Sequence, residues 1–359
     1  MNARHGGSLS EVQTFWSSVL EGWIDASASL SPCVPWLQIL SVINPRQISW
    51  YPSTGHRRLK SFLASIHGLD VEYFFLGNGA SELFTWAARD AALSGASVLL
   101  SPSFADYSRA LDCWSSHYEY EKYVLNWSDN CPSCFPLLEG GDVLWICNPH
   151  NPTGQLWSRA SLEPLLDRYA LVICDEAFLP LVPNGEQHSL IPLVAEYSNL
   201  VVIRSLTKLF GIAGLRLGYA VSQSKRLQRW AGWRDPWPVN GIALAVGERL
   251  LASPRRYRRW CERVQRWTAM EGAWMQRHLA AMPGITPMPS AANYLLIRAN
   301  RSLVPLREAL ERKHRILLRD CRSFEGLGET WLRIGLQSRR KNRRIVRALR
   351  EELQRSPLA

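Results

Sequence analysis

The sequence predicts an α/β protein, built on a mostly parallel central sheet, with a second and smaller α+β domain. Two patterns support this prediction. Between about residues 70 and 225, short apolar runs alternate with longer amphipathic segments, a pattern typical of strands buried on both faces and the helices that cover them. After Pro238 the chain becomes helical and Arg-rich, and then shows shorter strands and helices.

The elements follow in chain order. Four apolar runs are predicted as parallel strands, at residues 98–102, 142–149, 171–178 and 200–208. Apolar residues have helical spacing in segments 108–117, 159–170, 241–282 and 302–313, and in a terminal helix that ends near 355. Two further strands are expected near residues 316–320 and 331–336. We expect a large domain over residues 47–261 and a small domain made of residues 1–46 and 262–359.

The charge balance leaves three classes of partner to consider. Lys and Arg number 42 against 31 Asp and Glu, a formal charge of +11 that suits nucleic acid, an anionic membrane or a small acidic ligand. In the Arg runs, the basic residues flank apolar positions such as Tyr257 and Val264 at helical spacing, so we favour solvated helix faces over nucleic-acid binding.

Composition indicates the compartment as well. The first residues lack the apolar core of a signal peptide, and no run approaches the ~18 apolar residues of a membrane span. We therefore expect a soluble, cytoplasmic protein with no membrane partner. The 8 cysteines are scattered, and the Cys131–Cys134 pair has no second pair at zinc-ligand spacing. Reduced loop cysteines are favoured over a metal site.

Three consecutive predicted strands end in reactive side chains. Asn148 and Asn151 follow the first of them, Asp175 the second, and Ser205 and Lys208 the third. Ligands of open α/β sheets lie outside the carboxyl ends of the strands, so these groups are expected to meet at one edge. Each alone is also an ordinary cap or turn residue.

A phosphate site is predicted separately. The segment from Gly77 to Glu82, which contains Ala80 and Ser81, opens an amphipathic stretch whose free backbone N–H groups suit a phosphate. Glycines before a helix also occur in simple turns, and Ser81 also suits a helix cap. Arg216 supplies a guanidinium eight residues after Lys208.

These groups together suit pyridoxal phosphate. A lysine can form a Schiff base with its aldehyde, an acid can keep its pyridine nitrogen charged, and an amide can contact its phenolic oxygen. Lys208 must be neutral to react, and a neighbouring cation such as Arg216 favours the neutral form.

The segments 205–219, Asn148–Gly154 and Asp175–Phe178 closely resemble the class I/II aminotransferase group of fold-type I pyridoxal phosphate enzymes, close to histidinol-phosphate aminotransferase. The resemblance implies an aspartate-aminotransferase-like fold with a seven-stranded sheet and a homodimer. It implies that the cofactor is held by Lys208, Asp175, Asn151, Ser205, Arg216, Ala80 and Ser81, that Tyr107 stacks on the ring, and that Tyr51 reaches the partner's phosphate. Phe178 departs from the pattern, since many relatives have tyrosine there.

Other segments resemble one branch of this group, the L-threonine O-3-phosphate decarboxylases of cobalamin biosynthesis. Among these segments are His5–Gly7, Ile43–Pro45, Pro236–Asn240, Ala292–Leu296, Ile316–Cys321 and Trp331–Ile334. The branch implies loss of CO2 from threonine phosphate to give (R)-1-amino-2-propanol O-phosphate. The substrate-binding residues that we expect are His5, Asn44, Asn151, Arg319 and Arg333.

Alternatives remain at this stage. His5 also suits a disordered surface, Asn44 a turn, and Arg319 a surface ion pair. A histidinol-phosphate-type aminotransferase would also need an arginine-rich phosphate pocket. A nucleic-acid-binding or regulatory protein that retains a transaminase-like domain is a further alternative, although no DNA-binding extension is visible.

Overall fold

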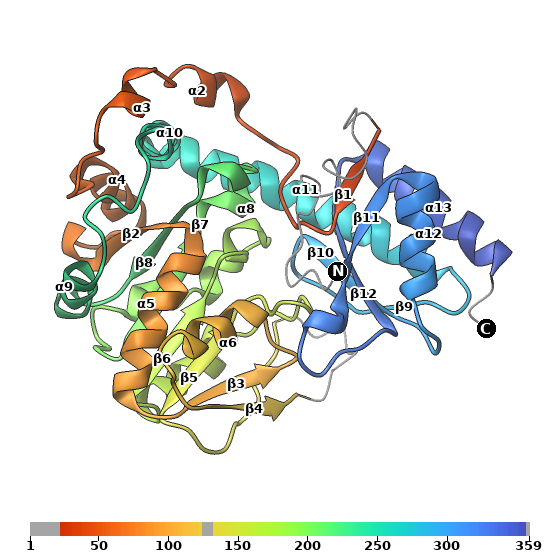
Figure 1. Cartoon of the computed structure of the whole chain (residues 1–359), viewed down its shortest axis with the longest axis horizontal. Helices are drawn as coiled ribbons and strands as arrows, with labels where there is room; N and C mark the ends of the chain where they lie inside the picture. The colour runs from red at the N-terminus through yellow and green to blue at the C-terminus, as the bar shows by residue number, and fades with distance from the viewer. Residues whose placement is uncertain (1–21, 124–131, 357–359) are drawn as a thin grey trace.

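The computed structural model describes residues 22–123 and 132–356 and contains two sheets side by side, joined by the long helix α11 (Pro254–Ala280) (Figure 1). This arrangement confirms the predicted α/β fold class. His5 and Cys131 lie outside the described residues.

The larger sheet has seven strands in the order β2-β8-β7-β6-β5-β3-β4. All neighbours are parallel except β8, which runs antiparallel to both β2 and β7. The strands are β2 (Phe74–Asn78), β3 (Ser97–Ser101), β4 (Tyr118–Lys122), β5 (Val143–Cys147), β6 (Leu171–Asp175), β7 (Leu200–Ser205) and β8 (Leu217–Val221). Four of these, β3, β5, β6 and β7, match the predicted runs.

Helices cover both faces of this sheet. Because side chains alternate along a strand, Phe74 of β2 enters one core and Phe75 enters the other. The core of Phe75 includes residues of α5 (Gly79–Ser94), α6 (Ala105–Asp112) and α9 (Ser224–Trp233). The core of Phe74 includes residues of α2 (Trp36–Leu40), α4 (Arg57–His67), α8 (Leu206–Phe210), α10 (Gly241–Leu251) and the first half of α11. The sheet is therefore buried throughout its centre, as its sequence predicts.

Two predicted helices are shorter than expected. The segment 159–170 forms α7 (Arg159–Leu162) and then a 3-10 turn, Glu163–Asp167, because Pro164 has no N–H to continue an α-helix. The segment 241–282 is divided between α10 and α11, and Ser253 caps α11 while Pro254 occupies its first turn.

The smaller sheet has five strands in the order β1-β11-β12-β10-β9. These are β1 (Ile24–Ala26), β9 (Thr286–Pro287), β10 (Tyr294–Arg298), β11 (Ile316–Asp320) and β12 (Trp331–Gly335). Strand β1 pairs in parallel with β11, so the N-terminal part of the chain completes a sheet built from its C-terminal part. Helices α12 (Val304–His314) and α13 (Arg339–Arg355) and the end of α11 share one core with this sheet.

Helix α11 belongs to both cores. Tyr257 and Val264 pack in the core of the large sheet, and Met275 and Leu279 pack in the core of the small sheet. The helix passes without a break through residue 261, where we expected the domain boundary, so that boundary stays a prediction. Among the described residues no helix is long and apolar enough to span a bilayer.

Candidate active site

A cavity of about 150 Å³ lies between the two sheets, where the carboxyl ends of β6 and β7 face β11 and β12. Side chains from distant parts of the sequence line it. They are Ser27, Ala28, Ser29, Ala80, Ser81, Phe84, Phe104, Asn151, Asp175, Ala177, Phe178, Ser205, Thr207, Lys208, Arg216, Arg319, Phe324 and Arg333. The cavity thus brings together most of the residues predicted from the sequence.

Lys208 reaches the cavity from the short helix α8, which begins directly after β7. Ser205 caps this helix, since its hydroxyl accepts a hydrogen bond from the N–H of Thr207 at 3.3 Å. The Lys208 Nζ lies 5.3 Å from the centre of the Phe178 ring. Burial, followed by the charges of Arg333 and Arg216, lowers the pKa of Lys208 to about 8. A usable fraction of neutral amine is therefore present near neutral pH.

Asp175 ends β6, and both of its carboxylate oxygens accept hydrogen bonds. The phenolic hydroxyl of Tyr107 donates to Oδ2 at 2.6 Å, and the N–H of Ala177 donates to Oδ1 at 2.9 Å. Burial raises the pKa of Asp175 to about 6, although these two hydrogen bonds act in the opposite direction. The carboxylate is thus fixed in place and ionised at neutral pH.

A cradle for an anion lies at the start of α5. Gly79 has a left-handed backbone, with φ of 75°, and an added Cβ would lie 2.6 Å from a guanidinium nitrogen of Arg216. Because Gly79 has no side chain, the Arg216 guanidinium can pack close to it. Ala80 and Ser81, in the first turn of the 16-residue helix α5, line the cavity at the positive end of that helix. The buried Thr207 hydroxyl, also in the lining, has no hydrogen-bond partner among the described residues.

Two buried arginines from the small sheet form the opposite wall. Arg319 of β11 and Arg333 of β12 are direct neighbours in the strand register and are 3% and 5% exposed. Arg333 donates to the side-chain oxygen of Asn151 and, at 3.1 Å, to the carbonyl of Ser27. Arg319 donates to the Ser323 hydroxyl at 2.7 Å. Two adjacent buried cations form a wall suited to a ligand with more than one negative charge.

The electrostatics of these arginines support that interpretation. Burial lowers the pKa of Arg333, and it lowers the pKa of Arg319 to about 10, which leaves Arg319 protonated at neutral pH. Within residues 22–123 and 132–356, no acidic side chain forms a salt bridge with Arg333, and its Nε lacks a hydrogen-bond partner. A buried cation with unused donors is costly unless a ligand compensates it.

Some predicted residues lie elsewhere in this chain. Asn44 is exposed, and its side chain accepts from the N–H of Arg46, which is the turn role considered for it above. Tyr51 is 80% exposed and packs on Trp237, with ring centres 4.5 Å apart. Neither lines the cavity. Tyr107 is buried beneath Asp175 and is not part of the lining.

The structure adds residues that sequence reasoning missed. Phe104, three residues before Tyr107, lines the cavity beside Asp175 and Lys208. Ser29 also lines the cavity, is 1% exposed, and has a hydroxyl without a hydrogen-bond partner in the described part of the chain. The aromatic residue in Ser103–Tyr107 and the serine repeat in Asp25–Ser31 were the available signals.

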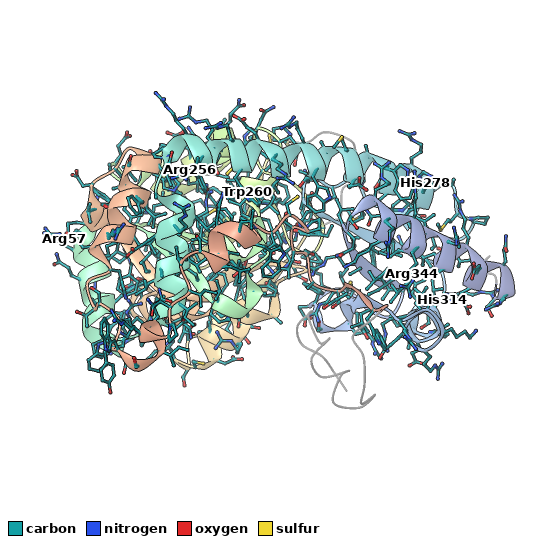
Figure 2. The ribbon with its side chains drawn as sticks, turned by 90° about the horizontal axis from the view of Figure 1, so that it is seen from above. Arg57, Arg256, Trp260, His278, His314 and Arg344 are labelled. Carbon is teal, nitrogen blue, oxygen red and sulfur yellow. The ribbon has the colours of Figure 1, made fainter. Side chains whose placement is uncertain are left out.

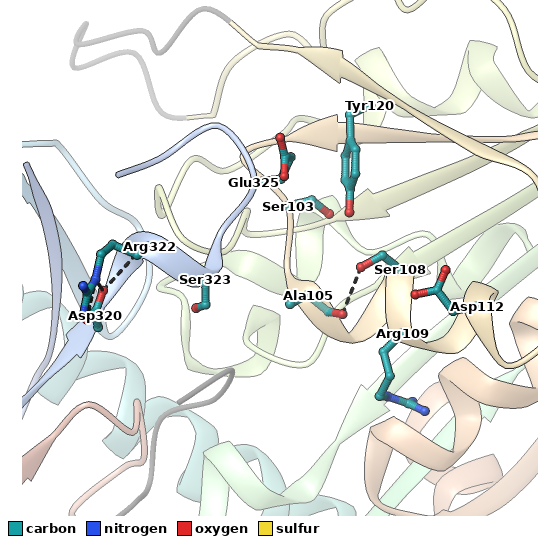
Figure 3. A pocket seen from close by; sticks show the side chains of 10 residues that line it. All are labelled: Ser103, Ala105, Ser108, Arg109, Asp112, Tyr120, Asp320, Arg322, Ser323 and Glu325. Carbon is teal, nitrogen blue, oxygen red and sulfur yellow. Dashed lines mark hydrogen bonds and ion pairs between the residues drawn. The ribbon is translucent and has the colours of Figure 1, made fainter. Parts of the chain in front are cut away.

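A second hollow, of about 510 Å³, lies next to the cavity between α6, β4 and the turn after β11 (Figure 3). Its lining mixes charges, with Arg109 and Arg322 against Asp112, Asp320 and Glu325. Arg322 pairs with Asp320, two residues before it at the end of β11, as the dashed lines show. No lysine is among the described residues that line this hollow, so the smaller cavity around Lys208 is the candidate active site.

The fold defines a class, the α/β enzymes that use pyridoxal phosphate, and a buried lysine lines this cavity. Comparison with known proteins agrees. Residues 37–349 match the family described as aminotransferase class I and II, and the chain belongs to this family. Members of the family are pyridoxal phosphate enzymes, so the predicted cofactor is confirmed.

Individual relatives and one solved structure show which members of the family the chain resembles. The chain is 32% identical to threonine-phosphate decarboxylase of Salmonella typhimurium over 98% of this chain and 97% of that protein. It is also 32% identical to histidinol-phosphate aminotransferase of Symbiobacterium thermophilum, over 86% of this chain and 83% of that one. A solved histidinol-phosphate aminotransferase from Sinorhizobium meliloti, in complex with pyridoxal-5'-phosphate, has the same fold, with a TM-score of 0.78, 20% identity and coverage of 91% and 90%.

Proposed function

We propose that this enzyme decarboxylates L-threonine O-3-phosphate to (R)-1-amino-2-propanol O-phosphate and CO2, a reaction of cobalamin biosynthesis. The observation that carries the proposal is the pair of adjacent buried guanidinium groups, Arg319 and Arg333, opposite Lys208. Threonine phosphate has two anionic groups, a carboxylate and a phosphate. The relative from Salmonella typhimurium, similar along nearly its whole length, supports the same substrate.

The residues present fit pyridoxal phosphate. Lys208 is the amine for its aldehyde, and Asp175 is the partner for its pyridine nitrogen. The start of α5, with Ala80 and Ser81, and the side chains of Ser205, Thr207 and Arg216 would hold its phosphate. Asn151 would contact its ring oxygen. When bound, the cofactor supplies an electron sink for the bond that breaks at Cα of the substrate.

The ring is expected to lie against Phe104. Phe104 lines the cavity, whereas Tyr107 is buried behind Asp175, so we assign ring stacking to Phe104. Tyr107 instead holds Asp175 in position. Phe178 packs edge-on against Tyr294, with ring centres 5.1 Å apart, and supplies an apolar wall below Lys208.

Orientation of the substrate decides the reaction. Decarboxylation requires the Cα–carboxylate bond to stand perpendicular to the cofactor ring, whereas transamination requires the Cα–H bond there. Arg319 and Arg333 are fixed on neighbouring strands, so they can hold the two anionic groups of the substrate at a set spacing. Ser29 adds an unused buried hydroxyl to the same wall.

We also propose that the enzyme is a homodimer. Exposed apolar side chains gather on the segment that carries α2 and α3 (Arg46–Ser49), namely Trp36, Leu37, Leu40, Ile48, Trp50 and Tyr51. An exposed apolar surface of this kind is stabilised when a second copy of the chain covers it. In a dimer this segment would bring Tyr51, and with it Asn44, toward the partner's cavity. Sedimentation equilibrium of the wild type and of Leu37→Glu tests this.

A histidinol-phosphate-type aminotransferase is the competing function, because a relative of that name is as similar in identity over a shorter span. The test is to incubate the pure holoenzyme with L-threonine phosphate and, separately, with histidinol phosphate plus 2-oxoglutarate. Release of CO2 and an amino alcohol phosphate from the first mixture supports the proposal. Glutamate formation in the second mixture, without CO2 release in the first, would overturn it.

A further inference from the structure

None of the residues of the Arg-rich helices α11 and α13 lines the catalytic cavity. A groove of about 450 Å³ lies between α11 and α13, and its lining includes Trp274 and His278 from α11 and Arg343, Arg347 and Arg350 from α13. His278 lies near the C-terminal end of α11, beside α13 (Figure 2). We propose that this groove binds a nucleoside polyphosphate, with the arginines on its phosphates and the Trp274–His278 pair beside its base.

The arginines of the groove are available for a ligand. Arg343, Arg347 and Arg350 are exposed, and within the two described ranges none of them forms an ion pair with an acidic side chain. Nearby carboxylates are mostly engaged: Glu271 pairs with Arg339, and Glu352 pairs with Lys313 and Arg355. Among the described residues of the lining, Glu351 is the one acidic side chain against three arginines, so these residues carry an excess of positive charge.

The spacing of the arginines suits one small ligand. Residues at i, i+4 and i+7 lie on one flank of a helix, and Arg343 and Arg350 are about 10 Å apart along the axis. That length matches a single polyphosphate chain better than a strand of nucleic acid. A guanidinium group binds phosphate through two parallel hydrogen bonds, and each phosphate of a polyphosphate chain can accept such a pair.

The aromatic pair supplies a partner for a flat ring. Trp274 and His278 stack with their ring centres 4.0 Å apart, one helical turn from each other. The carbonyl of Trp274 lies 2.8 Å from Nδ1 of His278, so this contact orients the imidazole. The guanidinium of Arg339 also lies over the Trp274 ring, 4.9 Å from its centre. We therefore assign the contact with the base to His278, which lines the groove next to the three arginines.

The groove is separate from the catalytic cavity. Leu332 and Ile334 of β12 face the core that α13 covers, whereas Arg333 between them faces the cavity. A ligand in the groove therefore lies behind the sheet that carries Arg319 and Arg333. Binding there does not compete with the substrate for the same cations.

Calorimetric titration of the holoenzyme tests the proposal, with ATP, inorganic tripolyphosphate and adenosine as separate probes. We expect saturable ATP binding that weakens as salt increases, weaker tripolyphosphate binding, and no measurable adenosine binding. Arg343→Ala with Arg347→Ala should weaken ATP binding about tenfold or more. The matched control is Arg340→Ala, an exposed arginine of α13 outside the groove, which should change it little.

Further variants separate the two sites and the two parts of the groove. His278→Ala should weaken the binding of ATP more than the binding of tripolyphosphate, because it removes the ring beside the base and none of the arginines that contact the phosphates. Arg319→Gln, in the catalytic cavity, should leave ATP binding unchanged. The proposal is wrong if ATP fails to bind, if tripolyphosphate binds as well as ATP, or if Arg319→Gln abolishes the binding.

Discussion

The phenolic hydroxyl of Tyr107 donates a 2.6 Å hydrogen bond to Oδ2 of Asp175, and both residues are buried. The bond favours the ionised carboxylate, while burial opposes it, and the pKa of Asp175 settles at about 6. Burial also raises the pKa of Tyr107 well above its usual value, so the hydroxyl remains a donor over the working range of pH. Tyr107 therefore helps to keep Asp175 ionised for the cofactor.

The first prediction concerns this contact. Tyr107→Phe removes the donor and keeps the ring, so the pKa of Asp175 should rise further above 6. The acidic limb of the pH dependence of kcat/KM should then shift upward by about one pH unit. Tyr118→Phe, which loses only an exposed hydrogen bond to Asp112, is the control. A uniform loss of activity with an unmoved acidic limb would contradict the assigned role.

The second prediction concerns the phosphate cradle. Gly79→Ala places a methyl group against Arg216 and strains a backbone with positive φ, so the affinity for pyridoxal phosphate should fall about tenfold or more. Gly214→Ala, in the 3-10 turn before Arg216, meets no atom within 4 Å and should bind the cofactor normally. Equilibrium dialysis of the apoprotein measures both affinities. Equal affinities in the two variants would show that the start of α5 does not hold the phosphate.

The third prediction concerns Ser29. Its buried hydroxyl has no partner in the described chain, so Ser29→Ala should leave the melting temperature almost unchanged. Because Ser29 also lines the cavity, kcat/KM for threonine phosphate should fall by about tenfold. Ser31→Ala is the counterpart, since the Ser31 hydroxyl accepts from the N–H of Cys33. There we expect lower stability and little kinetic change, and the reverse result would remove Ser29 from the site.

The fourth prediction concerns the link between α12 and α13. Hydrogen bonds from Lys313, His314 and Arg355 lower the pKa of Glu352 to about 2, below its ordinary value of 4.5. Glu352→Gln should therefore reduce the free energy of unfolding by about 1–2 kcal/mol at pH 7, a value reduced for the exposure of Lys313 and Arg355.

The pH dependence of that loss has a definite direction. A lowered carboxylate pKa stabilises the fold above the unfolded pKa, and the effect disappears as the pH falls from about 4.5 to about 2. Urea unfolding of the wild type and Glu352→Gln should therefore converge in that range. Glu351→Gln is the control on the same helix, and a difference that persists at low pH would point to packing instead of charge.

Much of the fold was predictable because it depends on local pattern. The buried strands β3, β5, β6 and β7 are apolar runs. Asp175 is the last residue of β6, and Lys208 lies three residues after the end of β7. Because β6 and β7 are parallel, these positions place both side chains at the same edge of the sheet. Strand β8 was harder to predict, because an antiparallel strand inserted between β2 and β7 depends on tertiary pairing.

The residues that were placed differently depend on helix geometry or on contacts between distant segments. Phe104 precedes α6 and Tyr107 lies in its first turn, so helix geometry alone decides which aromatic ring faces the cavity. Ser29 reaches the cavity because β1 pairs with β11, more than 290 residues later in the chain. Asn44 lies in a turn outside the cavity of its own chain, and its predicted role therefore depends on the proposed dimer.

The most direct test of decarboxylation is the reaction of the holoenzyme with L-threonine phosphate in D2O, with the product analysed by NMR and mass spectrometry. When the Cα–carboxylate bond breaks, CO2 leaves and one solvent deuteron binds to Cα, while the original Cα hydrogen remains. We predict an amino propanol phosphate that carries one deuterium and one original hydrogen at that carbon. Exchange of the Cα hydrogen of threonine phosphate for deuterium, without loss of CO2, would contradict the account.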